Sequence, residues 1–279
     1  MPGFPRSILK VSAVAPPAPT LHADTTSFVN RMAAAGDSLS EAKITLIDAL
    51  VKDCYSIGFR NAQTPDDSLI QDCLIPIAAT TLNGAMVKLW NKIGIANTAT
   101  ALNFAAEDVS SGLKGTANSN KRVDTGWNVA DHSDFADCHL ALFASDLNSA
   151  GVFGGANAPI NGNSSELTLV YYFGIYRFLA TQTSSGNFVD SAPGAARAFL
   201  LATCTTLSNS TIYQNGTALA SNNNPRINNR PSTNFIWFNR TDLYQATGMR
   251  AKYLALGKGI SADLQSAYNS LVSNFITAM

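Results

Sequence analysis

Short runs of β-forming residues, separated by turn-forming clusters, dominate the chain from residue 99 onward. The clearest pair covers residues 211–214 and 217–220, which are joined by Asn215-Gly216. An Asn-Gly pair suits a type I′ turn, because both central residues of that turn need a positive φ, and it is a strong signal for a β-hairpin. Clusters of Gly, Asn, Ser and Pro separate the other runs, as in an antiparallel sandwich. The sequence predicts strands over residues 99–104, 121–125, 139–144, 167–181, 196–207, 211–214, 217–220, 234–239 and 250–257.

Two glycine-containing stretches interrupt this pattern. The run 167–181 is too long for one strand, so Gly174 is expected to mark a bend or a bulge within it. The stretch from Gly151 to Gly155 is short and apolar, and it lacks the G-x-x-x-x-G-K-[ST] pattern of a phosphate-binding loop. We expect it to be a turn.

Helical periodicity marks both ends of the chain. Asp24 can cap a short helix that ends at Gly36, and the capping-box pattern from Ser38 to Glu41 begins a helix that reaches Gly58. Residues 59–79 are predicted to be an irregular connector, and residues 81–92 a further helix. Near the C-terminus, Ser261 can cap a helix with an apolar stripe at helical spacing, formed by Leu264, Ala267, Tyr268, Leu271, Val272 and Phe275.

The expected organisation has three parts. Residues 1–23 are Pro-rich and lack periodicity, which predicts an extended arm that binds to neighbouring subunits. Residues 24–98 form a helical N-terminal segment, and residues 99–279 form a β-sandwich domain that ends in a helix. The fold class predicted is therefore mainly β: an antiparallel, jelly-roll sandwich with an N-terminal α-helical segment and a C-terminal helix.

Three stretches carry a resemblance to a known family. They are YQNGTAL at residues 213–219, RVDTGWN from Arg122 to Asn128, and YLALGKGISADLQSAYNSLVSNF from Tyr253 to Phe275. Together they resemble concanavalin A-like (laminin G-like) β-sandwich proteins, of the lectin and glucanase fold, found in bacteriophage structural-gene clusters. The resemblance covers about residues 25–279, and its motifs belong mostly to the scaffold. It implies a concanavalin A-like sandwich in a virion context rather than a particular activity.

Composition excludes several classes of partner. Nineteen basic and nineteen acidic residues cancel, so bulk charge attracts neither nucleic acid nor an anionic membrane. No apolar stretch reaches the ~18 residues that a membrane-spanning helix needs, and Lys10 interrupts the only run that imitates a signal peptide. Only 14% of residues are charged, while Asn is abundant. Such a surface suits a component of an assembly, and it equally suits a β protein with Asn-rich turns.

The cysteine and histidine residues do not predict a metal site or a cofactor. Cys54, Cys73, Cys138 and Cys204 are widely separated, which predicts free, buried thiols of a protein made in a reducing cytoplasm. A second cluster contains Asp131, Asp134 and Asp137 together with His132 and His139. Residues three apart in a loop need not converge on one ion, so solvated carboxylates are expected there.

Catalysis is not expected either. The glycosidases of concanavalin A-like fold place carboxylates on one strand in Glu-x-Asp-x-Glu patterns, whereas this chain has only Glu41, Glu107 and Glu166, far apart. There is no G-x-S-x-G elbow and no recognisable Ser-His-Asp arrangement. We assign no catalytic residues.

Sugar binding remains as an alternative. Aromatic faces and amide groups are the groups that a glycan site uses, which makes Trp127, Asn128, Trp237 and Asn239 the candidate carbohydrate-binding residues. Aromatic residues in strands more often pack in the core, and that interpretation stays open for both tryptophans.

The leading functional hypothesis is a non-enzymatic bacteriophage virion structural protein, for decoration, collar, baseplate or fibre attachment. Its partners would be other virion proteins and copies of itself, in a virion assembled in the cytoplasm of the host bacterium. The alternative is a carbohydrate-binding module that recognises host surface glycan. A polysaccharide-degrading enzyme is the third hypothesis.

Overall fold

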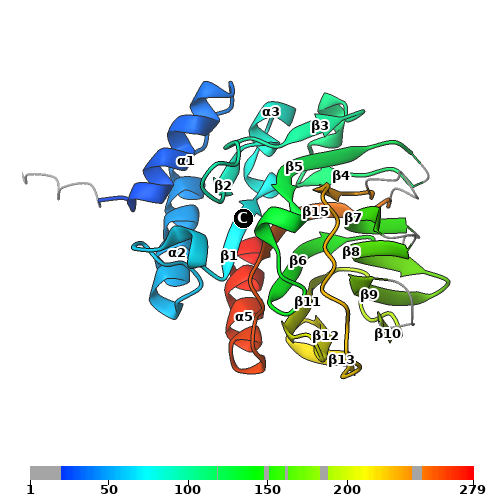
Figure 1. The fold of residues 1–279 in the computed structure, drawn as a ribbon. Helices are drawn as coiled ribbons and strands as arrows, with labels where there is room; N and C mark the ends of the chain where they lie inside the picture. Colours follow the sequence, from blue (N-terminus) through cyan, green and yellow to red (C-terminus); the bar gives the residue numbers. More distant parts are fainter. Residues whose placement is uncertain (1–19, 118, 148–150, 161–162, 183–187, 241–246) are drawn as a thin grey trace, which may run out of the picture.

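Two antiparallel sheets lie face to face, and helices cover the outer face of one of them (Figure 1). The computed structural model describes residues 20–117, 119–147, 151–160, 163–182, 188–240 and 247–279. The mainly β sandwich with helices near both ends is therefore confirmed.

The first sheet contains most of the strands that the sequence marks clearly. Within the described residues its order is β13-β12-β11-β6-β15-β1-β2, and β4 pairs with β15 beside this path. Asn215 and Gly216 have φ angles of 49° and 79°, so the predicted hairpin between β12 and β13 is confirmed. The strands are β1 (Ile70–Leu74), β2 (Lys88–Trp90), β4 (Leu113–Lys114), β6 (Cys138–Ser145), β11 (Ala198–Thr206), β12 (Asn209–Gln214), β13 (Thr217–Asn222) and β15 (Arg250–Gly257).

The second sheet has the order β10-β9-β8-β7-β14-β5-β3 among the described strands. Its strands are β3 (Thr100–Leu102), β5 (Arg122–Asn128), β7 (Gly151–Ile160), β8 (Asn163–Tyr172), β9 (Ile175–Gln182), β10 (Phe188–Ser191) and β14 (Asn234–Trp237). The predicted run 167–181 is divided between β8 and β9, because the chain reverses at Phe173-Gly174 instead of bending there.

The stretch expected as a turn, from Gly151 to Gly155, is the first half of β7. Its glycines make room for aromatic rings of the neighbouring strand β14. A Cβ atom on Gly154 would lie 2.6 Å from the ring of Trp237 and 2.7 Å from that of Phe235. A strand with these glycines packs closely on the two rings, which local sequence alone does not reveal.

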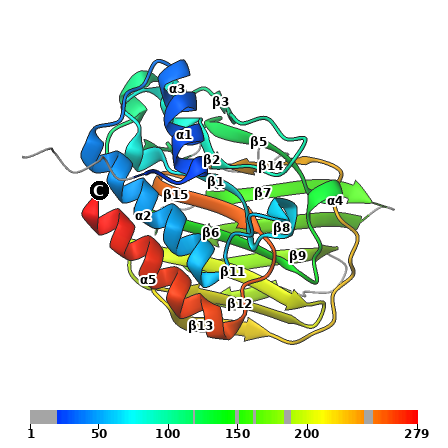
Figure 2. The ribbon, with the colours of Figure 1, turned by 90° about the vertical axis from the view of Figure 1, so that its left-hand side faces the viewer.

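Helices form a third layer on the first sheet. Figure 2 shows α2 (Glu41–Ile57) and α5 (Ala262–Ala278) lying side by side over this sheet, and α5 contacts β6, β11 and β15. Because helices cover one face and the second sheet covers the other, β6 and β11 are buried almost throughout. This two-sided burial explains their nearly continuous apolar sequences. The remaining helices are α1 (Ala23–Ala34), α3 (Leu82–Ala85) and α4 (Val129–His132).

The expected helix over residues 81–92 is wrong for its second half. The helix α3 ends at Ala85, and the chain then enters β2, which pairs with β1. The residues 59–79, expected as a connector, contain β1. Pairing between strands therefore overrides the helical spacing of the apolar residues here. The segment 24–98 contributes two strands to the first sheet.

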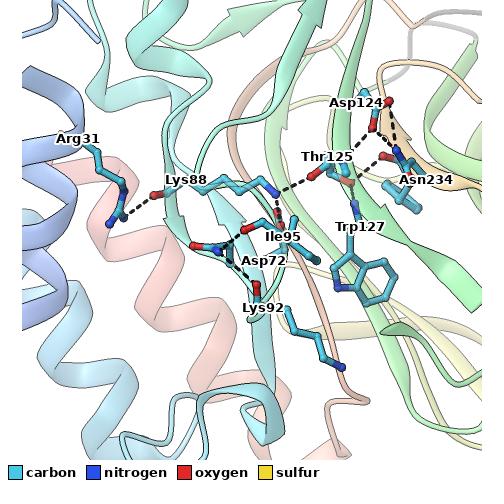
Figure 3. A network of polar contacts seen from close by, with 12 residues as sticks. Arg31, Asp72, Lys88, Lys92, Ile95, Asp124, Thr125, Trp127 and Asn234 are labelled. Carbon is cyan, nitrogen blue, oxygen red and sulfur yellow. Dashed lines mark hydrogen bonds and ion pairs between the residues drawn. The ribbon is translucent and has the colours of Figure 1, made fainter. Parts of the chain in front are cut away.

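A buried lysine connects the layers at this point (Figure 3). The Nζ atom of Lys88 on β2 lies 2.5 Å from Oδ2 of Asp72 on β1 and 2.6 Å from the carbonyl oxygen of Thr125 on β5. Arg31 of α1 donates to the carbonyl oxygen of Lys88 at 2.8 Å. One side chain and its backbone thus join a helix, the first sheet and the second sheet.

The predicted arm is described only from residue 20 onward, since residues 1–19 lie outside the described part. At its end, the backbone N–H of His22 donates to Oδ1 of Asp48 at 2.7 Å. The ring of His22 stacks on that of Tyr55, with centroids 4.5 Å apart. The described end of the arm therefore packs on α2 of its own chain.

Candidate functional site

The two tryptophans proposed for sugar stacking lie in the core. Trp127 on β5 and Trp237 on β14 are each 1% exposed, and Trp90 is 3% exposed. The ring of Trp237 packs edge-on against Phe235, with centroids 4.9 Å apart. Because no face of either proposed ring reaches solvent, the assignment of Trp127 and Trp237 to a sugar site is corrected to a packing role.

The two proposed asparagines bind backbone groups. Oδ1 of Asn128 accepts from the N–H of Ala130 at 3.0 Å and caps α4. Asn239 is 1% exposed and accepts from the N–H of Arg240 at 2.8 Å. Although β5 and β14 are neighbours, their register places Asn128 opposite Asn234 and Trp237 opposite Val123. The four residues therefore do not converge on one exposed site.

The predicted cluster of aspartates lies in a surface pocket of about 330 Å³. Its acidic lining and His132 are accompanied by three cations. The residues concerned are Asp66, Asp67, Asp131, His132, Asp134 and Asp137, with Lys92, Arg230 and Lys258. Two of these carboxylates bind backbone: Asp134 accepts from the N–H of Ala136 at 2.8 Å, and Asp137 from that of Gly259 at 2.7 Å. His139 lies elsewhere, buried on β6. Across the described part of the chain, no group of three His, Cys, Asp or Glu side chains could hold a metal ion.

A larger pocket gathers unpaired positive charge. Its volume is about 570 Å³, and we call it the basic pocket because Lys43, Arg197 and Lys252 line it. Lys43 is in the first turn of α2, Arg197 directly precedes β11, and Lys252 is on β15. The remaining lining comes from residues with small, apolar or hydroxyl side chains: Ile77, Ala79, Thr80, Val109, Ser111, Ile276 and Met279.

Within the described part of the chain, no side-chain carboxylate lies within 4.0 Å of the charged nitrogens of Lys43, Arg197 or Lys252, so these charges are not neutralised by direct pairing there. The ammonium group of Lys43 donates to the carbonyl oxygen of Ala78 at 2.9 Å, which positions it without cancelling its charge. The C-terminal dipole of α5 offsets about half a charge at most.

A nearby carboxylate is already occupied. Asp37 accepts four hydrogen bonds, from the backbone N–H and the hydroxyl group of both Thr80 and Thr81, at 2.6–3.1 Å. Burial alone would raise the pKa of Asp37, but these four donors more than offset it, so the pKa lies below its ordinary value. Asp37 thus fixes the loop that forms one wall of the basic pocket.

One lysine of the basic pocket has a lowered pKa. Burial lowers the pKa of Lys252, and the charges of Arg197 and Arg250 lower it further. A bound anion would relieve this repulsion, and a cavity of this volume is in the range of small-ligand sites. The arrangement can therefore bind an anionic group with several cationic donors at once.

Sequence reasoning missed this pocket because its three cations come from positions 43, 197 and 252. None belongs to a basic cluster along the chain, and the balanced net charge conceals a local excess. The fold unites them: the strand order β11-β6-β15 puts one strand between Arg197 and Lys252, and α2, which packs beside α5 over this sheet, adds Lys43 (Figure 2).

No described helix is both long enough and apolar enough to cross a membrane. No protein-family model matches the chain, and no curated protein matches it.

Solved structures do share its fold. A mutant of Trypanosoma rangeli sialidase with trans-sialidase activity is similar with a TM-score of 0.52 and 13% identity, over 84% of this chain and 39% of the sialidase. Trypanosoma rangeli sialidase in complex with sialic acid gives a TM-score of 0.51 at 13% identity, with the same coverage. The binding domain of botulinum neurotoxin DC in complex with SialylT has a TM-score of 0.45 at 12% identity, over 74% of this chain and 52% of that domain, which is too low to support a conclusion.

These findings correct the leading functional hypothesis. The expected role as a non-enzymatic bacteriophage virion structural protein is contradicted, because the two structures described above with a TM-score over 0.5 are both sialidases. The chain spans 39% of the length of those sialidases, and at 13% identity the likeness shows a shared fold alone.

Proposed function

We propose that this protein binds carbohydrate that carries a negative charge, and that the basic pocket is the binding site. The single observation that carries the proposal is the convergence of Lys43, Arg197 and Lys252 on one cavity without a carboxylate partner among the described residues. Cations left unpaired at the surface of a pocket are suited to carboxylate, sulfate or phosphate groups.

The fold supports a carbohydrate rather than another anion. One structure that shares the fold is a sialidase holding sialic acid, a sugar with a carboxylate group. The concanavalin A-like class that the sequence resembles includes lectins and glucanases, and we propose that the sandwich is of this class. Both comparisons point toward sugar ligands, and the pocket contributes the preference for negative charge.

We further propose that the protein binds its ligand without cleaving it. Its three glutamates lie on separate elements: Glu41 at the start of α2, Glu107 in the turn 106–108, and Glu166 on β8. Glu166 pairs with Arg240 at 2.7 Å, so that carboxylate is already engaged by a cation. The chain therefore lacks the paired glutamates that glycosidases of concanavalin A-like fold carry on one strand.

The test is titration calorimetry of the purified protein with three sugars: 3′-sialyllactose, a heparin disaccharide and lactose. The first carries a carboxylate, the second carries sulfate groups, and the third is neutral. We expect at least one acidic sugar to bind about tenfold or more tightly than lactose, and its affinity to fall as salt rises. The two acidic sugars then distinguish carboxylate from sulfate as the anion recognised.

Matched lysine variants on one helix provide the control. Lys43→Ala removes a charge from the basic pocket, whereas Lys52→Ala removes one from the exposed part of the same helix. Binding should weaken in the first variant and stay unchanged in the second. Equal affinity for lactose and for both acidic sugars, or no binding to any of them, would contradict the proposed function. Release of free sialic acid from sialyllactose would contradict the absence of catalysis.

A further inference from the structure

The hairpin that joins β8 to β9 has an unusual residue at its tip. Phe173 and Gly174 have φ angles of 46° and 80°, nearly the same as the 49° and 79° of Asn215 and Gly216 in the other hairpin. Positive φ at both central residues favours Asn-Gly, which is what the second hairpin has. A bulky side chain at the first of these positions is a backbone outlier.

Phe173 is also 85% exposed, more than any other large apolar side chain in the described residues. The fold gains little from it, since the ring is not buried and the backbone conformation disfavours it. An asparagine would satisfy the turn better, as Asn215 shows. Phe173 is therefore unfavourable for folding both because its ring is exposed and because its φ angle is positive. Contact with a ligand explains the presence of this residue better than folding does.

A second ring accompanies it. The ring centroid of Tyr172 lies 4.1 Å from that of Phe173, and the planes meet at 56°. We call these two rings the aromatic tip. Behind them, Nε and Nη2 of Arg177 each donate to the carboxylate of Asp190 at 2.7 Å, so the cation on this strand is already paired.

The strand order puts the aromatic tip at the same end of the sandwich as Arg197 of the basic pocket. Tyr171, just before the tip, pairs with Gly151, the first residue of β7. The chain reaches Gly151 a few residues after β6 ends at Ser145. Ala198 pairs with Ala144 at that same end of β6, so Arg197 lies there too.

We propose that the aromatic tip, Tyr172 and Phe173, is a second contact for the acidic glycan, on which a sugar ring stacks. This inference rests on the proposed function, and it adds that the ligand is an oligosaccharide long enough to extend beyond the basic pocket. The exposed ring of Phe173 suits the apolar C–H face of a sugar, and the half-buried ring of Tyr172 beside it extends the aromatic surface.

Other occupants fit less well. A stable protein interface covers about 800 Å² on each partner, far more than two rings offer. Lasting attachment to a membrane needs a second signal, such as unpaired cations beside the apolar group. Arg177, on the strand behind the tip, is instead held by Asp190.

The test uses Phe173→Asn, which copies the sequence of the other hairpin, and the probes are sialic acid monomer and an α2,8-linked oligomer of eight sialic acids. In the wild-type protein we expect the oligomer to bind more tightly than the monomer. In Phe173→Asn the oligomer should bind about tenfold more weakly, while monomer affinity and the salt dependence of binding stay unchanged. The midpoint of thermal unfolding should stay the same or rise, because Asn suits the turn.

The reverse change, Asn215→Phe, is the matched control. It should lower the unfolding midpoint and leave binding of both probes unchanged. If the wild type binds the heparin disaccharide but neither sialic acid probe, the same comparison is made with that disaccharide and a heparin octasaccharide. If the wild type binds none of these sugars, the proposed function fails and this inference with it. If the wild type binds and Phe173→Asn retains full oligomer affinity, the inference alone is overturned.

Two further measurements cover the other occupants. Sedimentation with vesicles of phosphatidylcholine and phosphatidylserine should show no binding, and analytical ultracentrifugation should show no self-association that depends on Phe173. Vesicle binding or dimerisation that is present in the wild type and lost in Phe173→Asn would overturn the assignment of the aromatic tip to a sugar.

Discussion

The ammonium group of Lys88 lies 2.5 Å from the carboxylate of Asp72, and the two side chains are 0% and 2% exposed. Both residues belong to the first sheet, yet the same ammonium group also donates to the carbonyl oxygen of Thr125 in the second sheet. A charged pair at this depth is stable only when each partner compensates the other. The Lys88–Asp72 pair, together with the bond from Lys88 to Thr125, therefore fixes the position of the two sheets relative to each other at β1, β2 and β5.

Replacing Lys88 with methionine should lower the free energy of unfolding by about 3–5 kcal/mol, because Asp72 is left as an unpaired buried charge. Urea unfolding followed by tryptophan fluorescence measures this change. The double variant Lys88→Met with Asp72→Leu should recover most of the loss, since it removes both charges. A loss below about 1 kcal/mol in the single variant would contradict the role assigned to the pair.

His139 should make the protein sensitive to mild acid. Burial lowers its pKa to about 4, while the hydrogen bond to the carbonyl oxygen of Lys258 works in the opposite direction. In the unfolded chain the pKa is about 6.5, so between these values the unfolded state takes up a proton that the folded state does not. Stability should be unaffected above about pH 6.5 and should fall by about 3 kcal/mol as the pH drops to 4.

Unfolding free energies measured between pH 7.5 and 4 test this dependence. His139→Gln should remove most of it, and a smaller part should remain from His132, whose pKa is also lowered by burial. An identical pH profile in His139→Gln and in the wild type would contradict the prediction.

The basic pocket should carry an electrostatic penalty in the absence of ligand. Arg197 is one of the charges that lower the pKa of Lys252, after burial. Arg197→Ala should therefore leave the free energy of unfolding unchanged or raise it by about 0.5 kcal/mol, while binding of an acidic sugar weakens. Thermal unfolding at low and high salt provides the check: added salt should stabilise the wild type more than the variant. A marked loss of stability in Arg197→Ala would show a structural role instead.

The four cysteines should be inert in the folded protein. The structure describes Cys54, Cys73, Cys138 and Cys204 as free and buried, as the sequence predicts. Burial raises the pKa of Cys54 and of Cys73 well above the ordinary range, which suppresses the reactive thiolate. A thiol reagent should therefore label no cysteine under native conditions and all four in urea. Rapid labelling of any one without denaturant would contradict this burial.

Strands with local signals were predictable from the sequence. The bounds of β15, Arg250–Gly257, match the predicted range 250–257, because a β-rich run is bounded there by turn-forming residues. The helix α5 was predictable as well, since its apolar stripe faces the sheet through Tyr268 and Val272. The strands β2 and β7 were not. In β2, Lys88 pairs with Asp72, which is distant in the sequence. The glycines of β7 are explained by their close packing on the rings of β14.

The candidate site was less predictable than the fold. Sequence reasoning selected Trp127 and Trp237 for their chemistry, but the inward alternation of their strands buries both. The cations of the basic pocket have no local pattern, since strand order and the packing of α2 over the first sheet bring them together. The aromatic tip did have a signal, because Phe173-Gly174 occupies a position where Asn-Gly is the usual choice.

The place of β15 in the first sheet has a consequence for how the protein is made. This strand lies between β6 and β1, so it connects the two parts of the sheet that emerge earlier from the ribosome. During synthesis β1 has only the short strand β2 as a neighbour until residues 250–257 arrive. A nascent chain that stops before residue 250 would hold two unjoined half-sheets with exposed edges, and the arrival of β15, rather than early local folding, would complete the sheet.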